Sequence, residues 1–136
     1  MPLFMLDTDA ASAVIKGHEQ AEKRLRALPM DGWCISAVTA AEHHYGLAKK
    51  PAAPRLAELV HAFLEVVVVT PWDRSAAAEL GQLRAHLERD GHMIGTYDSL
   101  IAAHALSLNL TLVTANVREF SRVAGLRIEN WHAAQA

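Results

Sequence analysis

Short apolar runs alternate along the chain with longer segments in which apolar residues recur at helical spacing. The runs predict β-strands at residues 3–6, 33–36, 66–70, 111–114 and 127–129. The longer segments predict helices at residues 10–16, 19–28, 39–50, 55–64, 74–91, 96–108 and 118–121. Because strands that alternate with helices usually pair in parallel, we expect an α/β/α sandwich with a central, mostly parallel sheet of four to five strands.

Capping and breaking residues set the expected ends of several elements. Thr8 is a candidate N-cap for the first helix, and Asp73 is one for the long fifth helix. Residues 39–42, Thr-Ala-Ala-Glu, match a capping box, and Pro51 marks the break after the helix that they open. Residues 66–70 form a continuous β-branched run, which is the pattern of a strand covered on both faces.

The composition is that of an ordinary globular domain. The chain has 136 residues, of which 51% are hydrophobic and 21% charged, so we expect residues 1–136 to form a single domain around one core. Its single cysteine, Cys34, cannot form an intrachain disulfide and lies in a predicted strand, where a buried thiol is expected. The first residues do not resemble a signal peptide, and no apolar run reaches membrane-spanning length. We therefore expect a cytoplasmic protein without membrane contact.

The net charge limits the ways in which this chain can bind nucleic acid. A net charge of −2 argues against a protein that coats nucleic acid without sequence preference, because such binding needs many Lys and Arg contacts to phosphates. A nuclease needs only a local basic rim, for which the candidates are Lys49, Lys50, Arg84, Arg89 and Arg118. Of these we keep Arg118 as a substrate-binding candidate, because its loop follows a predicted strand at the edge where acidic residues gather.

Four oxygen-bearing side chains fall where the predicted strands end and the helices begin. Asp7 ends the first strand, Glu42 opens the helix after the second, Asp98 lies in the first turn of the helix from residue 96, and Asn116 follows the strand at 111–114. In an open parallel sheet, sites form outside the carboxyl ends of the strands. Clustered carboxylates repel one another unless a cation offsets their charge, and oxygen ligands suit Mg²⁺ or Mn²⁺ better than zinc. The pattern therefore predicts a metal site and, with it, metal-assisted phosphodiester hydrolysis.

Each of these positions also has a purely structural explanation. Glu42 completes the capping box, the macrodipole favours Asp98 in a first helical turn, and Asp7 can be an N-cap. Those explanations do not cover the coincidence of all four residues at one edge of one sheet. The histidines do not suggest a competing zinc site, because His43 and His44 are adjacent on a helix and no zinc-binding spacing occurs. We expect His104 to be a core histidine with a hydrogen-bond partner.

The sequence resembles the PIN-domain family, and within it the VapC-type toxins of bacterial type II toxin-antitoxin systems. The resemblance runs essentially from end to end, with its segments in the family's order. It rests on Met-Leu-Asp-Thr at 5–8, Ile-Ser-Ala-Val-Thr-Ala-Ala-Glu at 35–42, Tyr-Gly-Leu at 45–47, Pro-Trp-Asp at 71–73, Ile-Gly-Thr-Tyr-Asp-Ser-Leu-Ile-Ala-Ala-His-Ala at 94–105 and Leu-Val-Thr-Ala-Asn-Val-Arg-Glu-Phe at 112–120. The ending, from Val123 to Trp131, also looks like the family.

The resemblance assigns roles to the candidate residues. It makes Asp7, Glu42 and Asp98 the metal-binding carboxylates and places Asn116 at the family's fourth acidic position. Asparagine offers a carbonyl oxygen without charge, so a second metal ion should bind more weakly, with Glu119 contributing through water. The supporting hydroxyls implied by the resemblance are those of Thr8 and Thr114 and, as a weaker candidate, Ser36.

The resemblance also implies a substrate and partners. Toxins of this type cleave RNA, with tRNA a frequent target, depend on Mg²⁺, for which Mn²⁺ can substitute, and usually form homodimers. A small VapB-like antitoxin silences them by inserting its C-terminal segment into the active site, commonly with an Arg that pairs with the acidic residues. The resemblance therefore implies a toxin ribonuclease.

Two other functions stay open at this point. Asp7 and Asp9 follow an apolar strand as Asp-Thr-Asp, which is similar to the nucleophile motif of haloacid-dehalogenase-like phosphatases, although no suitable later acidic pair follows Asp98. Alternatively, the chain is a non-catalytic PIN-like binding module whose acidic pocket only docks a basic peptide. Metal-dependent cleavage of RNA, release of phosphate, or neither activity would distinguish the three.

Overall fold

Five parallel strands form the centre of the molecule in the computed structural model, which describes residues 2–49 and 53–132. The strands are β1 (Phe4–Leu6), β2 (Trp33–Ser36), β3 (Val69–Thr70), β4 (Thr111–Val113) and β5 (Ile128–Glu129). Their order across the sheet is β3-β2-β1-β4-β5, and every neighbouring pair is parallel. The predicted parallel sheet is therefore confirmed, and it contains no antiparallel strand among the described residues.

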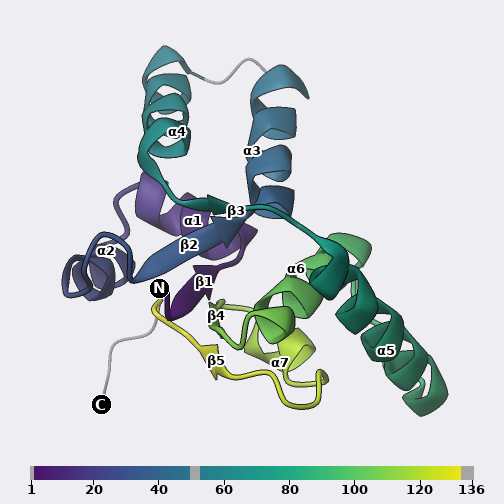
Figure 1. Cartoon of the computed structure of the whole chain (residues 1–136). Helices are drawn as coiled ribbons and strands as arrows, with labels where there is room; N and C mark the ends of the chain where they lie inside the picture. Colours follow the sequence, from purple (N-terminus) through teal and green to yellow (C-terminus); the bar gives the residue numbers. More distant parts are fainter. Residues whose placement is uncertain (1, 50–52, 133–136) are drawn as a thin grey trace.

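Helices cover both faces of this sheet (Figure 1). They are α1 (Thr8–Ile15), α2 (Glu19–Arg26), α3 (Ala37–Lys49), α4 (Pro54–Val66), α5 (Arg74–Asp90), α6 (Thr96–Ser107) and α7 (Val117–Phe120). In Figure 1, α3 and α4 stand side by side above the sheet, and α5 runs along α6. Helices α1 and α2 lie on the opposite face of the sheet from α5 and α6. The architecture is the α/β/α sandwich that the sequence predicts, and no helix among residues 2–49 and 53–132 is long and apolar enough to cross a membrane.

Two apolar clusters, one on each face of the sheet, hold the layers together. Successive strand residues point to opposite faces, so Met5 joins the cluster under α5 and α6 while Leu6 joins the cluster under α1 and α2. Cys34 and Ile35 divide in the same way, and both are fully buried. This explains why the central strands are continuously apolar, and it confirms the expectation of a buried thiol at Cys34.

Of the two candidate caps of the first helix, Thr8 is wrong and Asp7 is confirmed, and the predicted capping box is wrong. Asp7, not Thr8, is the N-cap of α1, because its Oδ1 accepts a hydrogen bond of 2.8 Å from the backbone N–H of Ala10. Helix α3 begins at Ala37, directly after β2, so Thr39 already lies in its first turn and Glu42 in its second, and neither has the position that a capping box requires. Glu42 is thereby released from a capping role, and its side chain instead contacts α1.

The strand predicted at residues 66–70 is mostly helix and loop. Helix α4 continues to Val66, whose side chain is exposed, and β3 contains only Val69 and Thr70. β3 is an edge strand next to β2, so it is not covered on both faces as a central strand is. The β-branched run led to a wrong prediction because it resembles a central strand in composition alone. The predicted basic candidate Lys50 and the break at Pro51 lie outside the described residues.

Candidate active site

Three polar residues end the three central strands at the same level of the sheet. Leu6 pairs with Ile35 on one side and with Val113 on the other. Asp7, Ser36 and Thr114 are the next residues on these strands, and all three are buried. The parallel register therefore brings them to one edge, where α1, α3 and α7 begin and where the first turn of α6 also lies.

Asp7 is held in place by hydrogen bonds that also act on its charge. Its carboxylate accepts hydrogen bonds from the Ala10 N–H and from the hydroxyl of Thr114, which itself accepts one of 2.9 Å from the Asn116 N–H. Burial nevertheless outweighs these contacts, and together with repulsion from Asp9 and Glu42 it raises the pKa of Asp7 to about 6. A buried carboxylate with this pKa is a group whose charge the fold tolerates poorly when no cation is present.

The pKa of Asp98 is raised more than that of Asp7. Burial is the largest cause of this shift. A hydrogen bond with Glu119 and repulsion from Glu119, Asp7 and Glu42 add to it, and together they raise the pKa of Asp98 to about 7. The predicted carboxylates Asp7, Glu42 and Asp98 are therefore close enough to repel one another, although they belong to three different helices and lie far apart in the sequence.

Glu119 is the negative partner of Asp98. Burial by itself would raise the pKa of Glu119, but hydrogen bonds from the Gly95 N–H at 2.8 Å, from Asp98 and from Asn116 outweigh it, and Arg122 adds attraction, so its pKa is lowered. The side-chain amide of Asn116 donates to the other oxygen of this carboxylate. The proton shared by this acid pair thus resides on Asp98, and Asn116 touches the cluster through Glu119.

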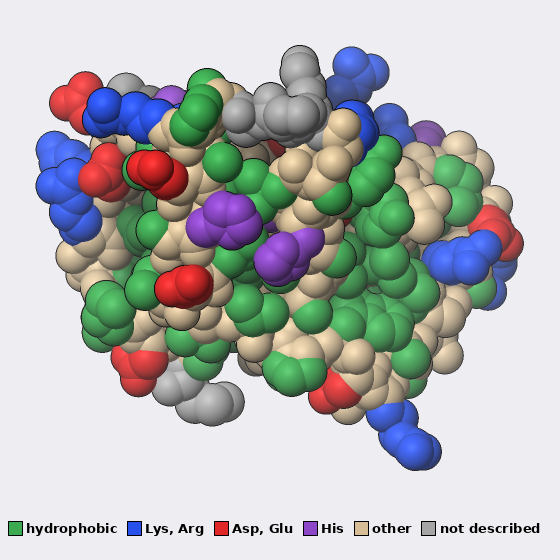
Figure 2. Space-filling model, turned by 90° about the horizontal axis from the view of Figure 1, so that it is seen from above, with side chains coloured by type: hydrophobic (Ala, Val, Ile, Leu, Met, Phe, Trp, Pro, Cys, Tyr) green, Lys and Arg blue, Asp and Glu red, His purple; other side chains and the backbone are tan. Residues whose placement is uncertain are grey.

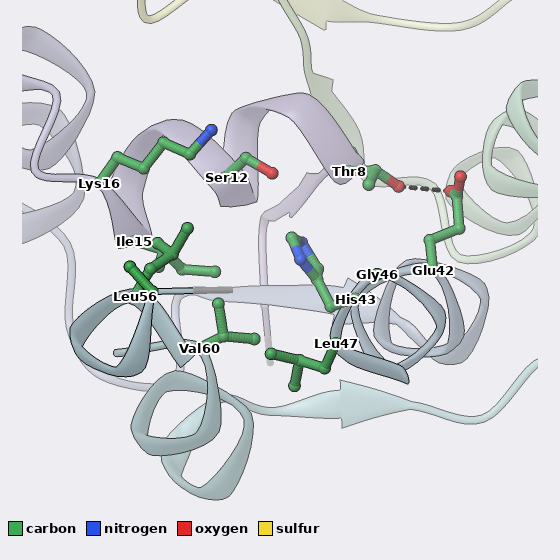
Figure 3. A pocket seen from close by; sticks show the side chains of 11 residues that line it. Thr8, Ser12, Ile15, Lys16, Glu42, His43, Gly46, Leu47, Leu56 and Val60 are labelled. Carbon is green, nitrogen blue, oxygen red and sulfur yellow. Dashed lines mark hydrogen bonds between the residues drawn. The ribbon is translucent and has the colours of Figure 1, made fainter. Parts of the chain in front are cut away.

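Glu42 reaches the cluster from α3 and contacts the first turn of α1. The hydroxyl of Thr8 donates a hydrogen bond of 2.5 Å to its Oε1 (Figure 3). The same hydroxyl lies 3.4 Å from the hydroxyl of Thr39, which is buried. The contact with Glu42 joins α1 to α3 through two residues that are 34 positions apart in the sequence. Thr8 and Glu42 thus form a hydrogen-bonded pair, and Thr8 is one of the residues whose hydroxyl the family resemblance makes a supporting group beside the site.

Ser36 makes its contacts in the core, and Arg118 lies at the surface. The hydroxyl of Ser36 is 2.8 Å from Nδ1 of His104 and accepts a hydrogen bond from the Val38 N–H, so its contacts serve the core and not the acidic cluster. His104 is buried and partnered, as predicted. Arg118 lies exposed on α7 next to Glu119, where its side chain is accessible to a ligand.

A pocket of about 530 Å³ opens beside Glu42 between α1, α3 and α4. In Figure 3 the side chains of Ile15, Leu47 and Val60 turn toward its centre, while Thr8 and Glu42 stand at one end. The pocket could not be predicted from the sequence, because it forms only where three helices meet. Its lining is mainly apolar, apart from a few polar groups that include Lys16 and His43.

The donor set suits a hard divalent cation, but the side chains do not converge on one. Among residues 2–49 and 53–132, no group of three or more His, Cys, Asp or Glu side chains is placed to hold a metal ion directly. Glu42 is turned toward Thr8, and Glu119 toward Gly95 and Asn116. Carboxylates that repel one another turn toward neighbouring hydrogen-bond donors, and a cation that offset the repulsion would favour the inward arrangement. The mutual repulsion at Asp7 and Asp98 is thus the feature that fits a cation.

The surface of the molecule carries no broad basic face on the side shown in Figure 2. Lys and Arg side chains lie in separate groups at the periphery of that face, and hydrophobic side chains occupy much of its centre. This agrees with the net charge of −2 and with the expectation that any nucleic-acid contact is local.

Comparison with known proteins places this geometry in a family. Residues 4–126 match the PIN domain. The chain belongs to the PIN-domain family. Its relatives include the tRNA(fMet)-specific endonuclease VapC of Salmonella typhimurium, which is 41% identical over 128 residues, spanning 94% of this chain and 97% of the relative. Ribonuclease VapC2 of Haemophilus influenzae is 39% identical over 129 residues, again covering 94% of this chain and 97% of the relative.

Solved structures that this chain resembles also have the PIN fold. The crystal structure of DNA-bound VapBC from Salmonella typhimurium superposes with a TM-score of 0.89 at 41% identity, covering 96% of this chain and 99% of the other. This chain is therefore a VapC-type PIN domain, as the motifs indicated, and the haloacid-dehalogenase interpretation of Asp7 and Asp9 is left without support.

Proposed function

We propose that this PIN domain is a metal-dependent endoribonuclease and that its substrate is a tRNA. The observation that carries the proposal is the meeting of Asp7 and Asp98 at the carboxyl edge of the sheet, where burial and, after it, the neighbouring carboxylates raise the pKa of both. Such perturbed acids at the edge of a parallel sheet are typical of functional sites. The relatives named as ribonucleases, and one as specific for tRNA(fMet), support the choice of RNA and of tRNA.

Each residue of the cluster would have its own role in such a site. Asp7, Glu42 and Asp98 would hold Mg²⁺, or Mn²⁺ in its place, with Asn116 supplying an uncharged oxygen at the edge. When bound, the ion neutralises phosphate oxygens and activates a water molecule for attack. Thr114 orients Asp7 and Thr8 orients Glu42 through the hydrogen bonds described above.

We also propose that a VapB-like antitoxin binds this domain and closes the site. The solved structures that this chain resembles include VapBC from Salmonella typhimurium, which supports a partner of this kind. An Arg of the antitoxin's C-terminal segment would pair with the carboxylates, since guanidinium and carboxylate form bidentate hydrogen bonds. The apolar pocket beside Glu42 suits the apolar side chains of the same segment. Homodimer formation, expected for proteins of this type, is tested by sedimentation of the purified chain.

The proposed function is tested by incubating the purified protein with total tRNA in the presence of Mg²⁺, Mn²⁺ or a chelator. We expect discrete RNA fragments that require the metal and return when Mg²⁺ is added to the chelated sample in excess. A parallel assay with a phosphatase substrate should release no phosphate. Absence of both activities would contradict the proposal and favour a binding module, whereas cleavage that persists in chelator would contradict the role of the metal.

The role of Asn116 can be measured separately by replacing it with Asp. The new carboxylate adds attraction for a divalent cation, so we expect Mg²⁺ to bind about 5-fold more tightly by calorimetry, the size of a partly screened charge contact. In metal-free protein the same carboxylate repels Glu119, whose contact with the Asn116 amide is lost. Asn116→Ala is the control, since it removes the amide without adding charge. Equal affinity in all three proteins would place residue 116 outside the coordination sphere.

A further inference from the structure

A second hollow, of about 440 Å³, also borders Glu42. It is lined by Ala41, Glu42 and Tyr45 of α3 and by Tyr97 of α6. Tyr97 immediately precedes Asp98, and Tyr45 lies one helical turn beyond Glu42. The chain contains only two tyrosines, and both border this one hollow, each close in sequence to a proposed metal ligand.

Both tyrosine side chains are presented to solvent. Tyr45 is 64% exposed and Tyr97 57% exposed, so neither ring is needed to fill the core. A single exposed aromatic residue is unremarkable in a folded protein. Two that flank the same hollow, beside the residues proposed to cut RNA, form a surface suited to planar ligands. The sequence analysis did not select them, because the helices that carry them are distant in the sequence.

The charge of the site makes such a surface useful for binding RNA. Carboxylates repel the phosphate backbone, and a protein with net charge −2 has few cations to compensate. Stacking of bases on aromatic rings does not depend on phosphate contacts and is the usual means of holding single-stranded RNA. The ammonium group of Lys49 lies 5.3 Å from the centre of the Tyr45 ring, which adds one positive charge at that end of the hollow.

We infer that Tyr45 and Tyr97 stack on unpaired nucleobases of the RNA substrate and so hold the bond to be cleaved beside Asp98 and Glu42. The inference rests on the proposed ribonuclease function and names two substrate-binding residues for it. Such stacking needs unpaired nucleotides, since the bases of a duplex are stacked on one another and leave no face for a tyrosine ring.

The test compares Tyr97→Leu and Tyr45→Leu with the matched controls Tyr97→Phe and Tyr45→Phe, which keep the aromatic face. On a short single-stranded RNA that the wild type cleaves once, each Leu variant should lose about 10-fold in kcat/KM, mostly through a higher KM. The Phe variants should cleave nearly as well as the wild type. Loss of activity in Phe and Leu variants alike would overturn the inference, because it would show that the hydroxyl and not the ring face matters.

A second arm ties the effect to the bases. The same RNA is made with an abasic sugar at each nucleotide next to the cleaved bond, one at a time. We expect one abasic substitution to slow the wild type about 10-fold and to cause no further loss in the Leu variant whose partner base is missing. Either of two results would overturn the inference in favour of a protein interface. One is that the Leu variants lose as much activity, relative to the wild type, on abasic RNA as on intact RNA. The other is a changed sedimentation coefficient of the Leu variants.

The outcomes also separate this inference from the function on which it rests. If the wild type cleaves no RNA in any metal, the proposed ribonuclease function fails. If the wild type cleaves RNA with metal and all four tyrosine variants match it, only the stacking role fails.

Discussion

Replacing Asp98 by Asn should lower the rate of metal-dependent RNA cleavage by about 1000-fold. The amide is the same size as the carboxyl group but cannot carry the charge that holds the cation and faces the reacting phosphate. Stability should not fall, because burial and the neighbouring carboxylates already disfavour the ionised form of Asp98, as its raised pKa indicates. Single-turnover cleavage and urea unfolding of the same preparations measure the two effects.

A matched control for this variant is Asp90→Asn. Asp90 is the last residue of α5, is half exposed, and lies 3.2 Å from His86, which is one turn earlier in the same helix. Cleavage by this control should be that of the wild type. If Asp98→Asn keeps most of the activity, or loses activity only because it unfolds, the placement of Asp98 in the catalytic cluster is wrong.

The stability of the metal-free protein should fall as the pH rises through the pKa values of Asp7 and Asp98. Both carboxyls bind a proton more tightly in the folded chain, at about 6 and about 7, than at the ordinary value of 3.8. The stability that they contribute is therefore fully present below about pH 4 and is lost as the pH rises through their folded pKa values. Asp98 is only half buried, so solvent screening reduces its share, and we expect the two groups to cost about 2 kcal/mol between about pH 5 and about pH 8.

The double variant Asp7→Asn/Asp98→Asn isolates this contribution. Asparagine keeps the N-cap of α1, and both proteins contain the buried histidines, whose lowered pKa values give the opposite pH trend. The free energy of unfolding, measured in urea with chelator, should fall more steeply with pH in the wild type than in the double variant. Mg²⁺ at about pH 8 should restore the wild type alone, because only it can bind the ion. Parallel pH curves for the two proteins would contradict the carboxylate repulsion.

The sequence predicted the layers of the fold well because its local signals agreed with one another. The strand at Trp33–Ser36 and the long helix between the caps Asp73 and Gly91 are found at the predicted places. The run at residues 66–70 failed because β-branched residues favour a strand only where neighbours are available to pair with them, and there the chain runs along the edge of the sheet.

The sequence by itself determined which polar residues lie at the carboxyl edge of the sheet. Asp7 and Thr114 follow apolar strands, and in a parallel sheet such positions must meet at one edge. Only the tertiary structure decided what each side chain contacts there. It turned Ser36 toward His104, joined Asp98 to Glu119, and placed Tyr97 opposite Tyr45 across a hollow. These contacts depend on strand register and helix packing between segments that are distant in the sequence, and no local pattern of residues specifies them.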